Sequence, residues 1–190
     1  YFKYFDFKLF FDKTFLIAIF LAFITFIGHK PHEDFGYYHL PYTIKMNSEK
    51  IILGLSNIAE PYTWNSTWLN LMSAFNLPFV NYKFISAPSL ILLIFTLSFL
   101  LKKVYQDISK QNFDLTFLLS TLFLFYILIK FNRFSAYGID IPVFYISMII
   151  IIKFLETFKK KISNIDFYFI LIAVSFVVTI KLSYISMILF

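Results

Sequence analysis

The sequence predicts an all-α fold: a polytopic transmembrane helix bundle of about five spans, with short juxtamembrane helices in its first outer loop. Two observations predict it. The 190 residues are 59% hydrophobic and 15% charged, whereas a soluble domain is about half apolar and about a quarter charged. The apolar residues also gather in blocks that approach the roughly 20 residues needed to span a bilayer. This composition excludes a soluble enzyme and a disordered chain, and the absence of cysteine excludes a disulfide-rich module.

Five apolar blocks account for the expected spans. They cover residues 10–27, 85–101, 115–129, 141–155, and about 167 to beyond 180. The first lacks a small-residue cleavage site, so we interpret it as a retained helix and not as a signal peptide. The second has Pro88 in its first turn, where proline is tolerated. Because the chain starts at Tyr1 and ends in an apolar run, we expect a fragment of a longer protein that forms one transmembrane domain over residues 1–190.

Lysines between the apolar blocks set the expected orientation. The net charge is +6, but the lysines lie in loops and form no basic patch of the kind that binds nucleic acid. The N-terminus and the loops around residues 102–114 and 153–166 hold most of them. The positive-inside rule therefore places these segments and the N-terminus in the cytoplasm. The three lysines at 159–161 are then a topology anchor.

Residues 28–84 form an outer loop that is too long for a simple connection, and loops of this length are usually functional. Helical spacing at 36–47 predicts one short helix. Ser48 could cap a second helix through 58, and Asn65 or Ser66 a third. The third would have one apolar face made of Trp68, Leu71, Met72 and Phe75. We expect these amphipathic helices to lie flat on the bilayer.

The sharpest local feature is the acidic pair Glu33 and Asp34, just after the first span. One interpretation is a general base, or a carboxylate that ligates a divalent metal, for a reaction at the outer surface. The alternative is two solvated loop acids. His29, His32 and His39 lie near the pair, but their spacing matches no strong metal motif, so hydrogen-bonded or solvated histidines are favoured.

Two further charged residues, Asp140 and Lys181, are candidate site residues. Asp140 lies at the outer mouth of the fourth span, on the same side as the acidic pair, where it is either a site residue or an N-cap of the helix that Pro142 starts. Lys181 lies in the fifth apolar run. A charge inside a membrane span suggests a function, such as contact with a phosphate near the outer leaflet, although snorkelling to the interface is the alternative.

These segments together resemble the GT-C glycosyltransferases, multi-span enzymes that use polyprenyl-phosphate sugars and include protein mannosyltransferases and aminoarabinose transferases. A group of bacterial membrane proteins of that type is especially similar. The residues that carry the resemblance are Glu33-Asp34-Phe35-Gly36-Tyr37-Tyr38-His39-Leu40-Pro41, Gly54-Leu55-Ser56-Asn57-Ile58, Trp64-Asn65-Ser66-Thr67-Trp68, Gly138-Ile139-Asp140-Ile141-Pro142 and Thr179-Ile180-Lys181-Leu182-Ser183.

The resemblance implies a role for each candidate. Asp34 would be the catalytic base, with Glu33 as its neighbour, and Asp140 would assist the acceptor or a divalent metal. Lys181 would hold the donor phosphate. Tyr38 and His39, inside the first motif, are expected to bind substrate. The implied partners are a lipid-linked sugar donor and membrane lipids, without nucleic acid, in a bacterial inner membrane.

Two other functions remain open from the sequence. A non-enzymatic membrane component, such as a transporter subunit or scaffold, would place polar groups at the bilayer midplane, whereas these spans are nearly free of them. A polysaccharide polymerase or ligase would share the lipid-linked substrate, and arginine clusters in the outer loops would favour it. If a transferase is correct, Glu33, Asp34 and Asp140 should converge at one outer-face cavity.

Overall fold

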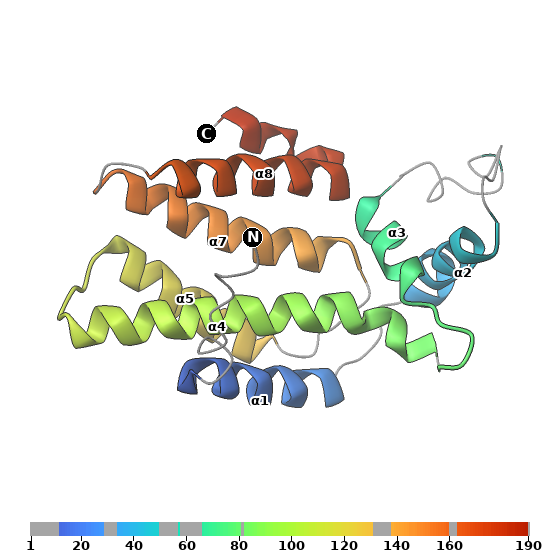
Figure 1. Cartoon of the computed structure of the whole chain (residues 1–190), viewed down its shortest axis with the longest axis horizontal. Helices are drawn as coiled ribbons and strands as arrows, with labels where there is room; N and C mark the ends of the chain where they lie inside the picture. Colours follow the sequence, from blue (N-terminus) through green and yellow to red (C-terminus); the bar gives the residue numbers. More distant parts are fainter. Residues whose placement is uncertain are drawn as a thin grey trace, which may run out of the picture.

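A computed structural model describes residues 12–28, 34–49, 57, 66–80, 82–130, 138–159 and 163–189. Within these ranges every regular element is a helix, which confirms the all-α class. Five α-helices lie along the long axis of the molecule (Figure 1). They are α1 (Lys13–Ile27), α4 (Ala87–Ser109), α5 (Leu115–Ile129), α7 (Asp140–Thr157) and α8 (Asn164–Ile180).

The helix bounds follow the apolar blocks closely, with two differences. Helix α4 continues to Ser109, past the expected end at 101. The extension contains the good helix formers Lys102, Lys103 and Gln106, and Lys103 pairs with Asp107 one turn later. Helix α8 ends at Ile180, so the expectation that the fifth span runs beyond this residue is wrong. In the described part of the chain, Phe84–Ser109 is the helix long and apolar enough to cross a membrane by length and composition, while α1, α5 and α8 are shorter apolar helices.

Side-chain caps fix where several helices begin. The Asp12 carboxylate accepts a hydrogen bond from the Thr14 backbone N–H, and Ser163 caps α8 by accepting from the N–H of Asp166. Asp114 accepts from the backbone N–H groups of Thr116 and Phe117. Each cap satisfies donors that the first turn leaves open. The polar residue before each apolar run therefore sets the start of the helix.

Helix α7 lies at the centre of the packing, since it contributes to two buried clusters. One cluster joins α7 to α1, α4 and α5, and the other joins it to α8 and the short helices of the long loop. Ala18 and Ala22 of α1, four residues apart, are fully buried against α4. Small residues at this spacing let two helix backbones approach closely, as they do between helices in membranes.

In its described residues the long loop has four short helices, which gather at one end of the bundle, on the right in Figure 1. We call these helices the loop unit: η2 (Phe35–His39), α2 (Leu40–Ser48), α3 (Thr67–Ala74) and η5 (Tyr82–Ser86). The helix expected over 36–47 is confirmed. Ser48 is the last residue of α2, and its hydroxyl donates to the carbonyl of Lys45. The helix that Ser48 was expected to cap lies, apart from residues 49 and 57, outside the described residues.

The apolar face expected on α3 packs on protein in part and so does not lie wholly on a bilayer: Trp68 and Met72 are buried, Phe75 is half-buried and Leu71 is exposed. Trp68, Leu69 and Met72 are buried in the cluster with α7 and α8. Each such burial contributes about 1.5–3 kcal/mol. The Thr67 hydroxyl also donates to the Thr179 hydroxyl of α8 at 2.9 Å. The loop unit is therefore docked on the bundle through its own apolar side chains.

The opposite end of the bundle carries a network of ion pairs. The Lys103 ammonium of α4 lies 2.7 Å from the Glu156 carboxylate of α7 and 3.3 Å from Asp107. Lys153 links Glu156 to Asp166 of α8, at 3.5 and 3.3 Å. These residues line a polar cavity of about 320 Å³ in which cations and anions are paired across helices. The network therefore clamps α4, α7 and α8 together at this end.

Candidate functional site

The first candidate motif, which begins with Glu33 and Asp34, continues into the loop unit at the end of the bundle where α4 begins. There the backbone adopts an uncommon conformation. Directly after Asp34, residues Phe35–His39 form a π-helical turn, in which the N–H of Leu40 donates to the carbonyl of Phe35. Pro41 follows as the second residue of α2, in the first turn, where proline is tolerated. Single π-helical turns are uncommon and frequently occur at functional sites.

Tyr38 is the residue on which the two predicted acids act together. Partial burial raises the pKa of the Tyr38 hydroxyl, and the negative charges of Asp34 and Asp140 raise this pKa further. Both carboxylates are therefore close enough to the same phenol to disfavour its ionisation. Asp34 and Asp140, which are far apart in the sequence, thus both lie within electrostatic range of Tyr38.

His39 connects the π-helical turn to the start of α7. Its side chain is buried, and its ring stands edge-on to the ring of Tyr38 with 4.1 Å between centroids. A Cβ atom on Gly138 would lie 3.6 Å from the Cε1 atom of His39, which is ordinary van der Waals contact. The segment that leads into Asp140 therefore passes directly over His39.

Asp140 is paired with Lys181. The Asp140 Oδ1 atom accepts a hydrogen bond from the Lys181 ammonium at 2.5 Å. Asp140 is the first residue of α7 and Ile139 is the N-cap, so the alternative interpretation of Asp140 as an N-cap is wrong. Lys181 follows the end of α8 with an extended backbone. The expectation that Lys181 lies inside an apolar span is also wrong, because the helix ends one residue earlier.

A cavity of about 410 Å³ opens beside this ion pair. It lies between the end of α5, the start of α7 and η6 (Leu182–Leu189), which folds back along α8 (Figure 1). The lining residues are Tyr126, Lys130, Asp140, Ile141, Phe144, Lys181 and Tyr184. Two ammonium groups, one carboxylate and aromatic rings therefore face one space.

Besides two apolar residues, Ile141 and Phe144, three polar lining residues were missed by the sequence reasoning. Lys130 directly follows an apolar block, where a lysine is typical of a loop charge and suggests no site. Its place at the same end as Asp140 was the signal that could have found it. Tyr126 and Tyr184 carried no signal, because the chain holds 13 tyrosines in total. Only the fold brings these two together.

Five of the six predicted site residues lie at this end of the bundle: Asp34, Tyr38, His39, Asp140 and Lys181. Asp140 and Lys181 line the cavity, whereas Asp34 does not, so the expected convergence of Asp34 and Asp140 at one cavity is not seen. Glu33 lies outside the described residues, as do His29 and His32. Among the residues that the structure describes, no three histidine or acidic side chains come together in a way that could hold a metal ion. The described side chains thus do not form a set that fits the divalent metal considered above.

The geometry defines a class: an all-helical protein with an acidic, basic and aromatic site at one end of an apolar bundle. The chain belongs to the family described as Domain of unknown function (DUF8201), whose model matches residues 1–190. No curated protein and no solved structure matches the chain.

Proposed function

We propose that this protein is a membrane glycosyltransferase of the GT-C type, which transfers a sugar from a polyprenyl-phosphate donor to an acceptor at the outer face of the membrane. The observation that carries the proposal is the ion pair between Lys181 and Asp140 beside a cavity that Lys130 also lines. The π-helical turn with Tyr38 and His39 lies next to the start of α7, as the contact between Gly138 and His39 shows. An anionic base and a cation at one end of an apolar bundle are what a lipid-linked phosphate donor requires.

Exposed apolar side chains support a bundle of about five spans. The helices expose large apolar side chains on α1 (Phe20, Phe23), α5 (Leu122, Phe125) and α8 (Leu171, Ile172). Soluble proteins rarely expose contiguous apolar patches of this kind. Hydroxyls on the same helices donate to backbone carbonyls one turn earlier, as Thr25, Ser120 and Ser175 do. Such internal bonding suits a helix without water around it.

The lengths and the charges suggest how the bundle sits in a bilayer. Helices α1 and α5 have 15 residues each, or roughly 23 Å at 1.5 Å per residue. This is shorter than the roughly 30 Å hydrocarbon core, so we expect local thinning or snorkelling lysines. The ion-pair network with its lysines would face the cytoplasm, as would the N-terminus, and the loop unit would face outward from a bacterial inner membrane.

In the proposed reaction, the carboxylate of Asp34 acts on the acceptor, and the cations act on the phosphate of the donor. The Asp34 carboxylate accepts the proton of an acceptor hydroxyl or amine as that atom bonds to the anomeric carbon of the donor sugar. The bond between the anomeric carbon and the phosphate oxygen breaks, and its electron pair leaves with the polyprenyl phosphate. Tyr38 and His39 pack beside the base and would contact the sugar or the acceptor.

The cations offset the charge that develops on the leaving phosphate. Lys181 has three N–H donors, of which the contact with Asp140 uses one. The others can reach an anion in the cavity, and Lys130 lines the same cavity. Asp140 thus holds Lys181 at the cavity wall and, as proposed from the resemblance, also faces the acceptor.

The test is sugar transfer by the full-length protein in proteoliposomes, with radiolabelled polyprenyl-phosphate mannose or aminoarabinose and host envelope extract as acceptor. We expect Asp34→Asn to lose transfer while Glu49→Gln keeps it. Glu49 is the matched control, because it is an exposed carboxylate at the end of α2 in the same loop unit. Undiminished transfer by Asp34→Asn would remove this residue from the role of base.

A further inference from the structure

The turn between α3 and η5 exposes apolar side chains, and none of its own residues is charged. No charged residue occurs between Glu60 and Lys83. The four residues 77–80 are all exposed, and the Phe79 side chain is 97% exposed. In water, such a turn would leave a large apolar side chain fully hydrated at its tip.

This exposure comes from an ordered turn. The backbone N–H of Asn76 donates to Ser73 and that of Val80 to Leu77, at 3.0 and 3.1 Å. The side chain of Asn47 in α2 donates to the carbonyl of Asn76 at 2.8 Å. The ring of Phe75 contacts the ring of Phe84, with centroids 6.2 Å apart. The turn is therefore held on both sides and presents its tip outward.

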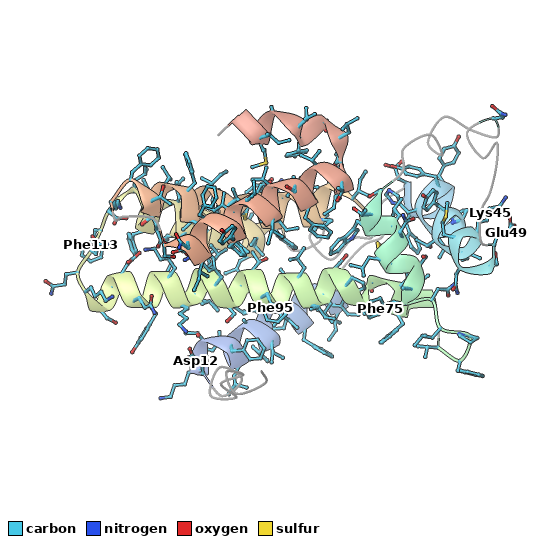
Figure 2. The ribbon with its side chains drawn as sticks, turned by 45° about the horizontal axis from the view of Figure 1, so that its top comes forward. Asp12, Lys45, Glu49, Phe75, Phe95 and Phe113 are labelled. Carbon is cyan, nitrogen blue, oxygen red and sulfur yellow. The ribbon has the colours of Figure 1, made fainter. Side chains whose placement is uncertain are left out.

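The position of the turn indicates what covers the tip. Through η5 the chain passes directly into Phe84–Ser109, the helix that is long and apolar enough to cross a membrane. Phe84, at the start of that helix, is itself exposed. Figure 2 shows Phe75 beside the N-terminal end of α4, with the turn projecting beyond that end. The exposed apolar surface of the turn is thus continuous with the N-terminal end of the helix that is long enough to span a bilayer.

We propose that the turn 77–80 is a membrane anchor, which inserts Phe79 into the outer leaflet of the bilayer that α4 spans. Aromatic and apolar residues are favoured at this boundary. The tip has no charged or hydrogen-bonding side chain, unlike the polar rim that surrounds a protein–protein contact. The anchor rests on the proposed membrane placement and adds a role: it holds the loop unit, and with it Asp34 and Tyr38, at the depth of the lipid phosphates.

The absence of native cysteine allows a direct test by site-directed spin labelling. The variants are Phe79→Cys, Leu122→Cys on the exposed face of α5, and Glu49→Cys on α2 as the water-facing control of the same loop unit. Each is labelled in the full-length protein and reconstituted in vesicles of phosphatidylethanolamine and phosphatidylglycerol. Power saturation then compares collisions with oxygen, which concentrates in lipid, and with a water-soluble nickel chelate.

We expect the label at 79 to behave like the one at 122, with oxygen collisions dominant, and opposite to the label at 49. Nickel collisions dominant at 79 would overturn the anchor. Low collision rates with both reagents at 79 would also overturn it, because they indicate cover by protein. Since no turnover is measured, these results leave the proposed sugar transfer untouched. A label at 122 in water would instead contradict the membrane bundle itself.

Discussion

The ammonium of Lys181 lies 2.5 Å from the carboxylate of Asp140 and joins the end of α8 to the start of α7. The Asp140 side chain is 69% exposed, and that of Lys181 is 36% exposed. Exposed pairs of this kind stabilise a fold by about 0–1 kcal/mol. The pair therefore contributes little to the free energy of unfolding. Its position beside the cavity indicates that Asp140 holds the Lys181 ammonium at the cavity wall.

This relationship predicts that Lys181→Gln separates activity from stability. We expect KM for the lipid-phosphate donor to rise by roughly 10- to 100-fold, since a hydrogen bond to a charged group contributes about 1.5–3 kcal/mol. The free energy of unfolding should change by less than about 1 kcal/mol. Steady-state kinetics and thermal unfolding in detergent measure both, with Lys45→Gln on α2 as the control. Equal effects of the two variants on KM would contradict the role of Lys181.

A second prediction concerns the contact between Gly138 and His39. Gly138→Ala should keep activity, because the added Cβ would lie 3.6 Å from the imidazole, at an ordinary contact distance. Gly138→Leu should lower the transfer rate, because the extra atoms displace His39 and Tyr38 from the start of α7. The measurement is kcat for the two variants against wild type. A leucine variant as active as the alanine variant would show that this packing does not position the site.

At the opposite end, Lys103→Met should destabilise the bundle strongly. The Asp107 side chain is 5% exposed and Lys103 14%, so the change leaves a buried carboxylate without its cation. Removing one partner of a buried pair costs about 3–5 kcal/mol. The double variant Lys103→Met with Asp107→Leu should recover much of this loss in thermal unfolding. No recovery would mean that the pair does not account for the effect.

Acid should weaken the start of α5 through Asp114. Partial burial raises the pKa of this carboxyl, but hydrogen bonds from Lys159, Thr116 and the N–H of Phe117 outweigh it and hold the pKa well below its usual 3.8. Because the pKa of Asp114 is lower in the folded protein than in the unfolded chain, its ionised carboxylate stabilises the fold at any pH above the unfolded pKa of about 3.8. This stabilisation is lost as the pH falls from 3.8 toward the pKa of the folded state.

Unfolding temperatures between pH 6 and pH 2 test this prediction. Wild type should lose stability in the acid part of the range, and Asp114→Asn should show a smaller dependence on pH because it cannot titrate. The same dependence in both proteins would show that other carboxylates control acid unfolding.

The sequence predicted much of the fold because the apolar blocks end at strong boundaries. Block 115–129 coincides with α5, since Asp114 caps its start. The face of α3 could not be predicted, because an apolar stripe fits a bilayer and a protein core equally well. Only the docking of Trp68 and Met72 on α7 and α8 decides between them.

The candidate site was predictable to the extent that charges in an apolar chain are rare. Asp34 and Asp140 stood out for this reason, and the fold brings both to Tyr38. The pairing of Lys181 with Asp140 was not predictable, because it depends on α8 ending at Ile180. Lys130 resembles the other loop lysines in sequence, and only the fold shows that it lines the same cavity as the ion pair.

The central claim is that Asp34 is the base of a sugar transfer from polyprenyl phosphate. The most direct measurement is a single-turnover reaction of the full-length protein with labelled donor and envelope acceptor, which counts sugar transferred and polyprenyl phosphate released. We predict equal amounts of both from wild type, and a rate lower by about 10²- to 10⁴-fold for Asp34→Asn, the usual range for loss of a general base. Wild-type rates from Asp34→Asn, or an intact donor with the wild-type protein, would contradict it.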